Sequence, residues 1–237
     1  MTRVGAMITR DLPPEDVPRL AASVAPGLDE LWVVEDLGWA GGITQVAAVL
    51  DATANDHAGR PRVGHGIAPA PFRNPAALAM EWAALARMHP GRLLPGIGHG
   101  LPEWMTRIGE PVGSPMTLLR ETTAAVRALL RGESVTTHGR YVHLDGVQLE
   151  FAPPDPVPVY LGVRGPKGLR LAGEMADGTV LASGPDPGEI QAAWSTIDAG
   201  HMAADRHDHH DLVVFTRYFC GDPADLPSPP PGVSGGW

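Results

Sequence analysis

The sequence predicts an α/β fold built on a parallel β-sheet, for two reasons. Seven short apolar runs recur along the chain and have the length of β-strands. The segments between them place apolar residues at the 3.6-residue spacing of amphipathic helices. Such alternation is typical of repeated βα units, whose strands pair in parallel. With 237 residues, the chain is expected to form one domain with a sizeable core.

The predicted strands are apolar runs such as LWVV and VYLG. In chain order they cover residues 3–8, 30–36, 62–68, 91–100, 157–163, 177–184 and 211–219.

Two predicted helices have clear boundaries. One begins at Asn74, a good N-cap residue, with Pro75 in the first helical position, and it ends before Pro90-Gly91. Its apolar face contains Leu78, Trp82, Leu85 and Met88. The other begins at Ser114-Pro115 and ends at Gly132, a residue type common just after a helix. Both faces are typical of residues packed in a core.

Two segments depart from the alternation. Residues 135–151 have period-two character around His138-Gly139, which predicts an antiparallel β-hairpin inserted over the sheet. Residues 221–237 lack periodicity and are rich in Pro, Gly and Ser, which predicts an irregular tail after a domain of residues 1–220.

Composition favours a small-molecule partner. The net charge of -9 argues against nucleic-acid binding and against attraction to an anionic membrane. The single cysteine, Cys220, excludes an intrachain disulfide and a thiolate metal cage, and it fits a reducing compartment. The first residues do not resemble a signal peptide, and no run reaches the roughly 18 apolar residues of a membrane span. We therefore expect a cytoplasmic protein.

The residues that end the predicted strands are the candidates for a site, because parallel βα folds bind ligands at the C-terminal ends of their strands. Glu35 and Asp36 end the second strand, and since neighbours on a strand face opposite ways, at most one is expected to face the site. His65 and His99 end the next two, beside glycines. Each histidine is either a ligand contact or a locally hydrogen-bonded side chain.

The loop Gly162–Gly168 predicts phosphate binding. It has exposed backbone N–H groups, a helix start at Pro166, and the cations Arg164, Lys167 and Arg170 close together. Lys167 is the only lysine of the chain. The alternative is that a short turn from strand to helix needs glycine in any case and that the cations are only solvated.

Two further patterns do not predict sites. The run Gly96–Gly100 lacks the spacing of a dinucleotide fingerprint. The polar run 207–211 precedes a strand, at the opposite end from the expected site, so no metal site is predicted.

Three stretches, residues 31–43, 62–100 and 139–184, resemble the luciferase-like flavin or deazaflavin oxidoreductases, especially the group that depends on coenzyme F-420. The resemblance covers about residues 1–220 and implies a TIM-like (β/α) barrel, a homodimer, and coenzyme F-420 as the cofactor, with FMN as the alternative. The implied reaction is hydride transfer with a small organic substrate. The other hypothesis is a flavin-binding barrel without catalysis.

Carried over by position, the resemblance assigns roles to several residues. Asp36 would lie near the cofactor ring, with Glu35 and His65 as further catalytic candidates. Gly66-Ile67 would form a non-prolyl cis peptide behind the ring. The cofactor tail and phosphate would contact His99, Gly100, Gly162, Val163, Arg164, Gly165 and Lys167.

The sequence departs from the family pattern in two ways. Leu37 follows Asp36 where many members have histidine, and the chain ends soon after the seventh predicted strand. The barrel is therefore expected to be incomplete at its C-terminal end, without a strand between the seventh and the first.

Overall fold

The computed structural model describes residues 2–54, 60–182 and 184–216. Within these residues, seven parallel strands form one curled sheet in the order β1-β2-β3-β4-β7-β8-β9, which confirms the predicted number of strands and their parallel pairing. The strands are β1 (Gly5–Ile8), β2 (Glu30–Val33), β3 (Arg62–Pro69), β4 (Leu93–Gly98), β7 (Tyr160–Gly162), β8 (Gly178–Leu181) and β9 (Asp211–Val214).

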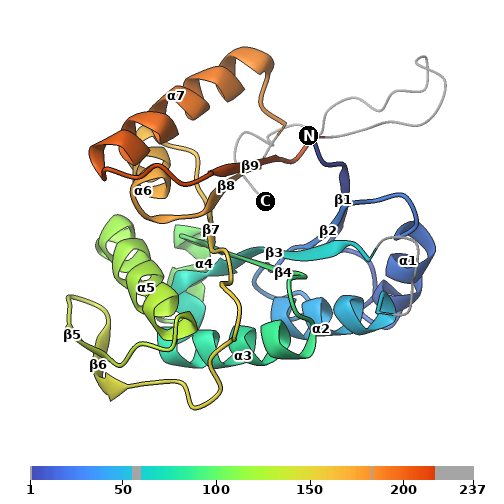
Figure 1. The fold of residues 1–237 in the computed structure, drawn as a ribbon, viewed down its shortest axis with the longest axis horizontal. Helices are drawn as coiled ribbons and strands as arrows, with labels where there is room; N and C mark the ends of the chain where they lie inside the picture. Colours follow the sequence, from blue (N-terminus) through green and yellow to red (C-terminus); the bar gives the residue numbers. More distant parts are fainter. Residues whose placement is uncertain (1, 55–59, 183, 217–237) are drawn as a thin grey trace.

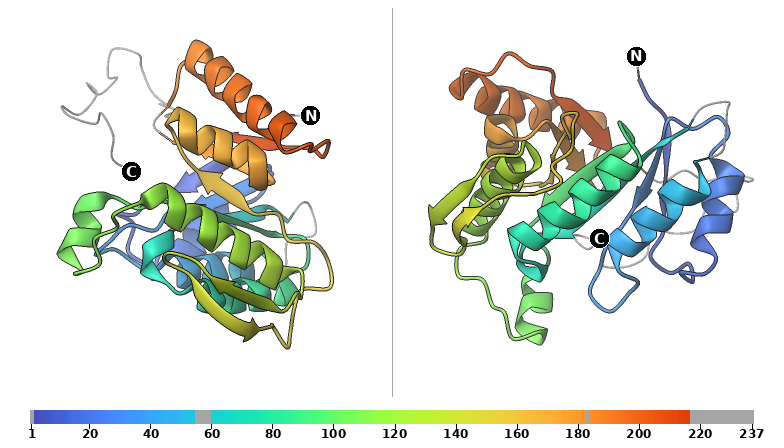
Figure 2. Two further views of the ribbon diagram at one scale, coloured as in Figure 1. Left: turned by 90° about the vertical axis from the view of Figure 1, so that its left-hand side faces the viewer. Right: turned by 60° about the horizontal axis from the view of Figure 1, so that its bottom comes forward.

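The helices form an outer layer around this half-barrel (Figure 1; Figure 2). They are α1 (Val17–Val24), α2 (Gly42–Ala52), η1 (Ala70–Phe72), α3 (Pro75–Met88), α4 (Pro102–Arg107), α5 (Pro115–Leu130), α6 (Pro166–Met175) and α7 (Pro187–Ala203). The main core lies between the sheet and these helices, where residues such as Leu31, Leu78 and Leu161 are fully buried.

Helix α3 has the predicted boundaries, but one predicted core residue is wrong. The Asn74 side chain accepts a hydrogen bond from Ala76 N–H at 2.9 Å and so caps the helix. Trp82 and Leu85 are buried as expected, whereas Met88 is 63% exposed. Each step of three residues turns about 60° short of a full circle, so two steps from Trp82 move Met88 off the buried face.

Helix α5 also has the predicted boundaries. Its start differs in detail, because the Ser114 hydroxyl lies 2.8 Å from the Thr117 hydroxyl and makes no capping bond to the backbone. Gly132 follows the helix with φ +78°, the left-handed conformation expected of glycine there.

The hairpin β5 (Val135–His138) and β6 (His143–Val147) is antiparallel, as predicted. Its expected position over the sheet is wrong, since it packs against α5 on the outer side of the helical layer (Figure 1; Figure 2). Val142 and Leu144 are buried in this contact, whereas alternate residues face solvent. The predicted tail, residues 221–237, lies outside the described residues.

A smaller cluster fills the concave side of the sheet. Trp32 makes edge-to-face contacts with Tyr160 and Phe215, with ring centroids 5.8 and 5.7 Å apart. Gly64 makes room for this indole, because a Cβ atom there would lie 2.1 Å from Trp32. These aromatic side chains hold the sheet curled around them.

The two edge strands approach each other without pairing. Within the described residues, β1 and β9 each pair with one strand, as expected for an incomplete barrel. Arg3, just before β1, donates to Asp211 at the start of β9 at 2.5 Å. The Tyr160 hydroxyl donates to the other Asp211 oxygen at 2.7 Å, so this carboxylate connects the edges to the inner cluster.

Candidate cofactor-binding site

A cavity of about 490 Å³ opens at the C-terminal ends of the strands. Its floor is the upper part of the inner cluster, formed by Met7, Val180 and Phe215. Its walls are Val34, Glu35, Asp36, Gly66, Ile67, His99, Gly100, Leu101, Trp104, Met116, Gly162, Val163, Arg164, Gly165, Pro166, Lys167, Gly168 and Ala182.

The structure brings nearly all the predicted site residues to this cavity. The exception is His65, which is fully buried on the helix-facing side of β3, with its ring edge-to-face against Trp82 of α3 at 5.9 Å. Glu35 and Asp36 both border the cavity, but the Glu35 carboxylate turns away from it toward Gly42, Arg73 and His65. Strand β2 ends at Val33, and the two acids lie in the following loop, where their side chains reach different partners.

Glu35 is held by several donors. Arg73 contacts both of its carboxylate oxygens, at 2.7 and 2.6 Å, and Gly42 N–H donates to Oε1 at 3.0 Å. His65 Nε2 lies 3.4 Å from Oε2, which is longer than a good hydrogen bond. Burial would raise the pKa of Glu35, but His65, Arg73 and the Gly42 N–H together lower it to about 2. This environment favours a positioning role over the catalytic role suggested by sequence.

Asp36 has a simpler environment. It is 7% exposed, and its Oδ2 accepts a hydrogen bond from Arg10 Nη1. Among the described residues, no donor contacts its Oδ1. Asp36 is therefore the carboxylate that can offer an oxygen to a ligand in the cavity.

The peptide Gly66-Ile67 is cis, as the family resemblance implied. The Ile67 side chain packs on Gly98 and Gly162, where an added Cβ atom would approach it to 2.5 and 2.7 Å. These glycines at the ends of β4 and β7 thus make room for Ile67, which forms part of the cavity wall.

The start of α6 forms the cationic end of the cavity. Gly165 is the N-cap and no side chain caps the helix, so the N–H groups of its first turn are not used by a capping side chain. Arg164 and Lys167 are exposed beside it and line the cavity. Arg170, expected in the same cationic cluster, does not line the cavity, and its Nε lies 3.4 Å from Glu174.

His99 is another residue of the cavity wall. Burial lowers its pKa, and a hydrogen bond with the backbone of Pro115 only partly offsets this effect. Its Nδ1 is buried and has no partner among the described residues. A neutral ring with an unpaired nitrogen can exchange a hydrogen bond with a ligand.

Sequence reasoning missed several residues around the site, among them Arg10, Arg73, Trp104, Met116 and Phe215. Arg10 follows β1 by two residues, so the same rule that selected Asp36 could have found it. Arg73 directly precedes the predicted N-cap of α3, but nothing in the sequence connects it to Glu35. Trp104 comes from α4, Met116 from the first turn of α5 and Phe215 from the position after β9, and no local pattern marks them.

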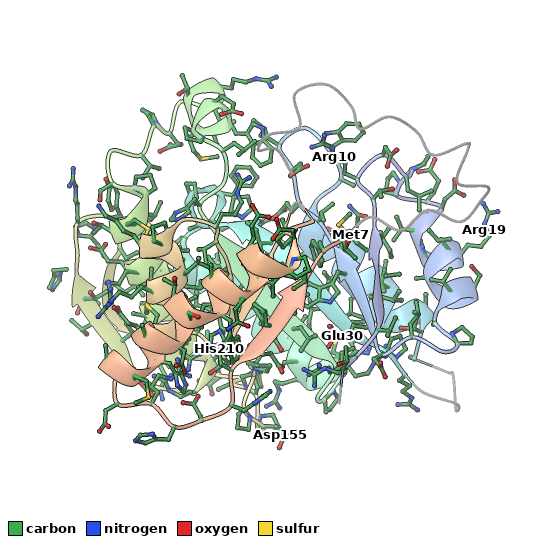
Figure 3. The ribbon with its side chains drawn as sticks, turned by 90° about the horizontal axis from the view of Figure 1, so that it is seen from above. Met7, Arg10, Arg19, Glu30, Asp155 and His210 are labelled. Carbon is green, nitrogen blue, oxygen red and sulfur yellow. The ribbon has the colours of Figure 1, made fainter. Side chains whose placement is uncertain are left out.

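The opposite end of the sheet holds a second polar region. Figure 3 shows Glu30 and His210 at that end, whereas Met7 and Arg10 lie at the end with the cavity. Within residues 2–54, 60–182 and 184–216, no three His, Cys, Asp or Glu side chains could hold a metal ion. None of the helices there has the length and apolar character needed to span a membrane.

A parallel βα half-barrel, with an uncapped helix start, two cations and a carboxylate around a cavity at its strand ends, defines a barrel suited to an elongated anionic cofactor. The chain belongs to the luciferase-like monooxygenase family, whose model matches residues 1–226.

Two relatives show the range of similar proteins. A 5,10-methylenetetrahydromethanopterin reductase of Methanolobus tindarius is 32% identical over 180 residues, which cover 76% of this chain and 53% of that protein. An F420-dependent glucose-6-phosphate dehydrogenase of Nakamurella multipartita is 35% identical over 119 residues, which cover 48% of this chain and 34% of that protein. The chain thus spans about half the length of the first relative and about a third of the length of the second.

Solved structures agree with the fold. The coenzyme F420 dependent tetrahydromethanopterin reductase of Methanopyrus kandleri superimposes with a TM-score of 0.77 at 22% identity, over 90% of this chain and 65% of that one. An F420-dependent secondary alcohol dehydrogenase gives a TM-score of 0.75 at 24% identity, over 90% and 68%.

Proposed function

We propose that this chain is an oxidoreductase that binds coenzyme F-420, with FMN as the alternative, and transfers hydride between the cofactor and a small organic substrate. The observation that carries the proposal is the polarity of the cavity. Its cationic end suits a phosphate, its middle is apolar, and Asp36 lies in the wall formed by the β2–α2 loop. The names of the relatives support the choice of coenzyme F-420.

The residues present fit such a cofactor. The first turn of α6, with Arg164 and Lys167, would bind the phosphate through backbone N–H groups and two positive charges. Ile67 would support the ring system from behind, and His99 would contact the part between ring and phosphate. When bound, the deazaflavin or flavin ring would supply the hydride chemistry.

The other wall of the cavity would serve the substrate. Asp36 would accept or return a proton through its free oxygen, and Glu35 would stay ionised and hold the loop that carries Asp36. Met7, Val180 and Phe215 would exclude water from the reacting groups.

Titration with coenzyme F-420 and with FMN, followed by fluorescence, tests the proposal. We expect micromolar binding of one cofactor, weakened about tenfold or more when Arg164 and Lys167 are both changed to alanine, because each replacement removes a charge-assisted contact. Arg170→Ala is the matched control, since Arg170 lies on the same helix but outside the cavity. Absence of binding for both cofactors would contradict the proposal, and binding without turnover across a broad substrate panel would favour a non-catalytic barrel.

We further propose that the chain acts as a homodimer in the cytoplasm. The single cysteine supports a reducing compartment. The outer face of α3 supports a self-association surface, because Met80 and Met88 are 61% and 63% exposed there. Ala84 lies midway between them in sequence, and Glu81 and Arg87 lie three residues on either side of Ala84. An antiparallel copy related by a twofold axis at Ala84 would therefore meet apolar side chains and an opposite charge.

A further inference from the structure

One turn in the β2–α2 loop carries both Asp36 and Trp39. Trp39 N–H donates to Asp36 C=O at 3.2 Å, which closes the turn. Gly38 has φ +87°, a conformation that glycine adopts readily at the third position of a turn. The turn therefore fixes the backbone positions from which the side chains of Asp36 and Trp39 extend.

Arg10 contacts both residues of this turn from a neighbouring loop. Its Nη1 donates to Asp36 Oδ2, and its guanidinium carbon lies 5.5 Å from the centre of the Trp39 ring. The exposed fractions are 7% for Asp36, 40% for the Arg10 side chain and 52% for Trp39. Arg10 thus connects the wall of the cavity to its outer rim, at the end where Figure 3 shows Met7.

No other described cation holds Asp36. Arg73 is bound to Glu35 and lies 3.6 Å from Glu81. Arg164 and Lys167 belong to the loop at the other end of the cavity, and neither bonds to Asp36. The orientation and the charge balance of Asp36 therefore depend on Arg10.

We propose that Arg10 is a positioning residue for Asp36, an inference that rests on the proposed function. It holds Oδ2, so that Oδ1 is the oxygen available to a ligand in the cavity. It also offsets a carboxylate charge that would otherwise repel an anionic cofactor. A nearly buried carboxylate without its partner is costly, so Asp36 would turn toward solvent in the absence of Arg10. Stacking on Trp39 keeps the guanidinium in place.

A double-mutant cycle tests this role. The probe is coenzyme F-420, with FMN in parallel, and the dissociation constant is measured for Arg10→Gln, Arg10→Lys, Asp36→Asn and the Arg10→Gln/Asp36→Asn double variant. We expect Arg10→Gln to weaken binding about five- to tenfold and Arg10→Lys to recover part of the loss. In the Asp36→Asn background, Arg10→Gln should have no further effect. The matched control is Arg19→Gln, because Arg19 is also paired with an aspartate, Asp16, but lies far from Arg10 in Figure 3.

A crystal structure of the cofactor-free Arg10→Gln variant gives a second readout, with Arg10→Met, which also removes the charge, taking its place if the first variant does not fold. A rotated Asp36 carboxylate would support the proposal, and an unmoved one would overturn it. An equal loss of binding in both backgrounds would also overturn it, because Arg10 would then contact the ligand directly. If the unmodified protein binds neither cofactor, the proposed function fails, while the orientation of Asp36 in the crystal still decides the role of Arg10.

Discussion

Glu35 and Asp36 are neighbours in sequence but have different chemical environments. Arg73, Gly42 and His65 surround the Glu35 carboxylate, whereas Asp36 has Arg10 as its charged partner. A carboxylate whose oxygens are all occupied holds its loop in place, and one with a free oxygen can exchange protons or hydrogen bonds. The difference between these environments separates a positioning residue from a candidate catalytic one.

The stability of the protein should depend on pH through Glu35. Its pKa is about 2 in the folded chain, below the ordinary value of 4.5. Its stabilising contribution, about 3 kcal/mol, is therefore complete above pH 4.5 and is lost as the pH falls toward 2. Urea unfolding at pH values between about 7 and about 3 should show Glu35→Gln much less stable than the unmodified protein at the higher pH, with the difference falling to about half or less at the lower.

Glu133→Gln provides the control for this measurement, because Glu133 forms an exposed pair with Arg131. It should change stability little at any pH. A constant difference between Glu35→Gln and the unmodified protein across the pH range would contradict the assigned ionisation of Glu35.

The sequence located these two acids because they follow an apolar run, and the cavity is where parallel strands end. It could not assign their partners. Arg10 is 26 residues before Asp36, and Arg73 is 38 residues after Glu35. Such pairs form only when the strands lie side by side in the fold. A local sequence pattern does not show which residues so far apart in the chain will meet.

Among the elements, helix boundaries were predictable and packing partners were not. Asn74, Pro75 and Gly132 act locally, so their effect can be predicted from the neighbouring residues. The position of the β5–β6 hairpin depends instead on Glu121 of α5. Its carboxylate accepts hydrogen bonds from three successive N–H groups, those of Arg140, Tyr141 and Val142, at 2.8, 2.8 and 3.0 Å.

Glu121→Ala should detach the hairpin from α5. Burial would raise the pKa of Glu121, but the backbone donors lower it, so the carboxylate is charged at neutral pH and binds the turn as an anion. Its loss should reduce the free energy of unfolding by about 1–3 kcal/mol, since three donors lose their partner. Amide hydrogen exchange at residues 140–142 should accelerate, whereas Glu133→Ala should leave it unchanged. Unaltered exchange in Glu121→Ala would show that apolar contacts of Val142 and Leu144 hold the hairpin without the carboxylate.

At the scale of the whole molecule, the number and the parallel pairing of the strands followed from the order of apolar runs. The curl of the sheet depends on contacts that the sequence does not reveal. Trp32, Tyr160 and Phe215 come from three separate strand regions and meet on the concave side. Arg3 and Asp211, which connect the two edges, are 208 residues apart. The same curl leaves α3 on the outside with an exposed face (Figure 1).

The proposed homodimer would use that face. In an antiparallel pair centred on Ala84, Met80 of one copy lies opposite Met88 of the other, and Glu81 lies opposite Arg87. Sedimentation velocity should show a dimer for the unmodified protein and a monomer for Met80→Glu/Met88→Glu, because four carboxylates would then meet at the interface. Met202→Glu should remain dimeric, since Met202 is equally exposed, at 64%, but lies on α7.

A charge exchange gives the sharper test of the symmetry. Glu81→Arg should weaken the dimer, because the new arginine of each copy would lie opposite Arg87 of the other copy. Adding Arg87→Glu should restore the dimer, because opposite charges would again face each other. Each copy also has local contacts at these positions, Arg73 near Glu81 and the Ala152 carbonyl with Arg87, so thermal unfolding of both variants must be compared. A double variant that stays monomeric while unfolding like the unmodified protein would exclude an axis at Ala84. Restored dimerisation would identify α3 as the interface.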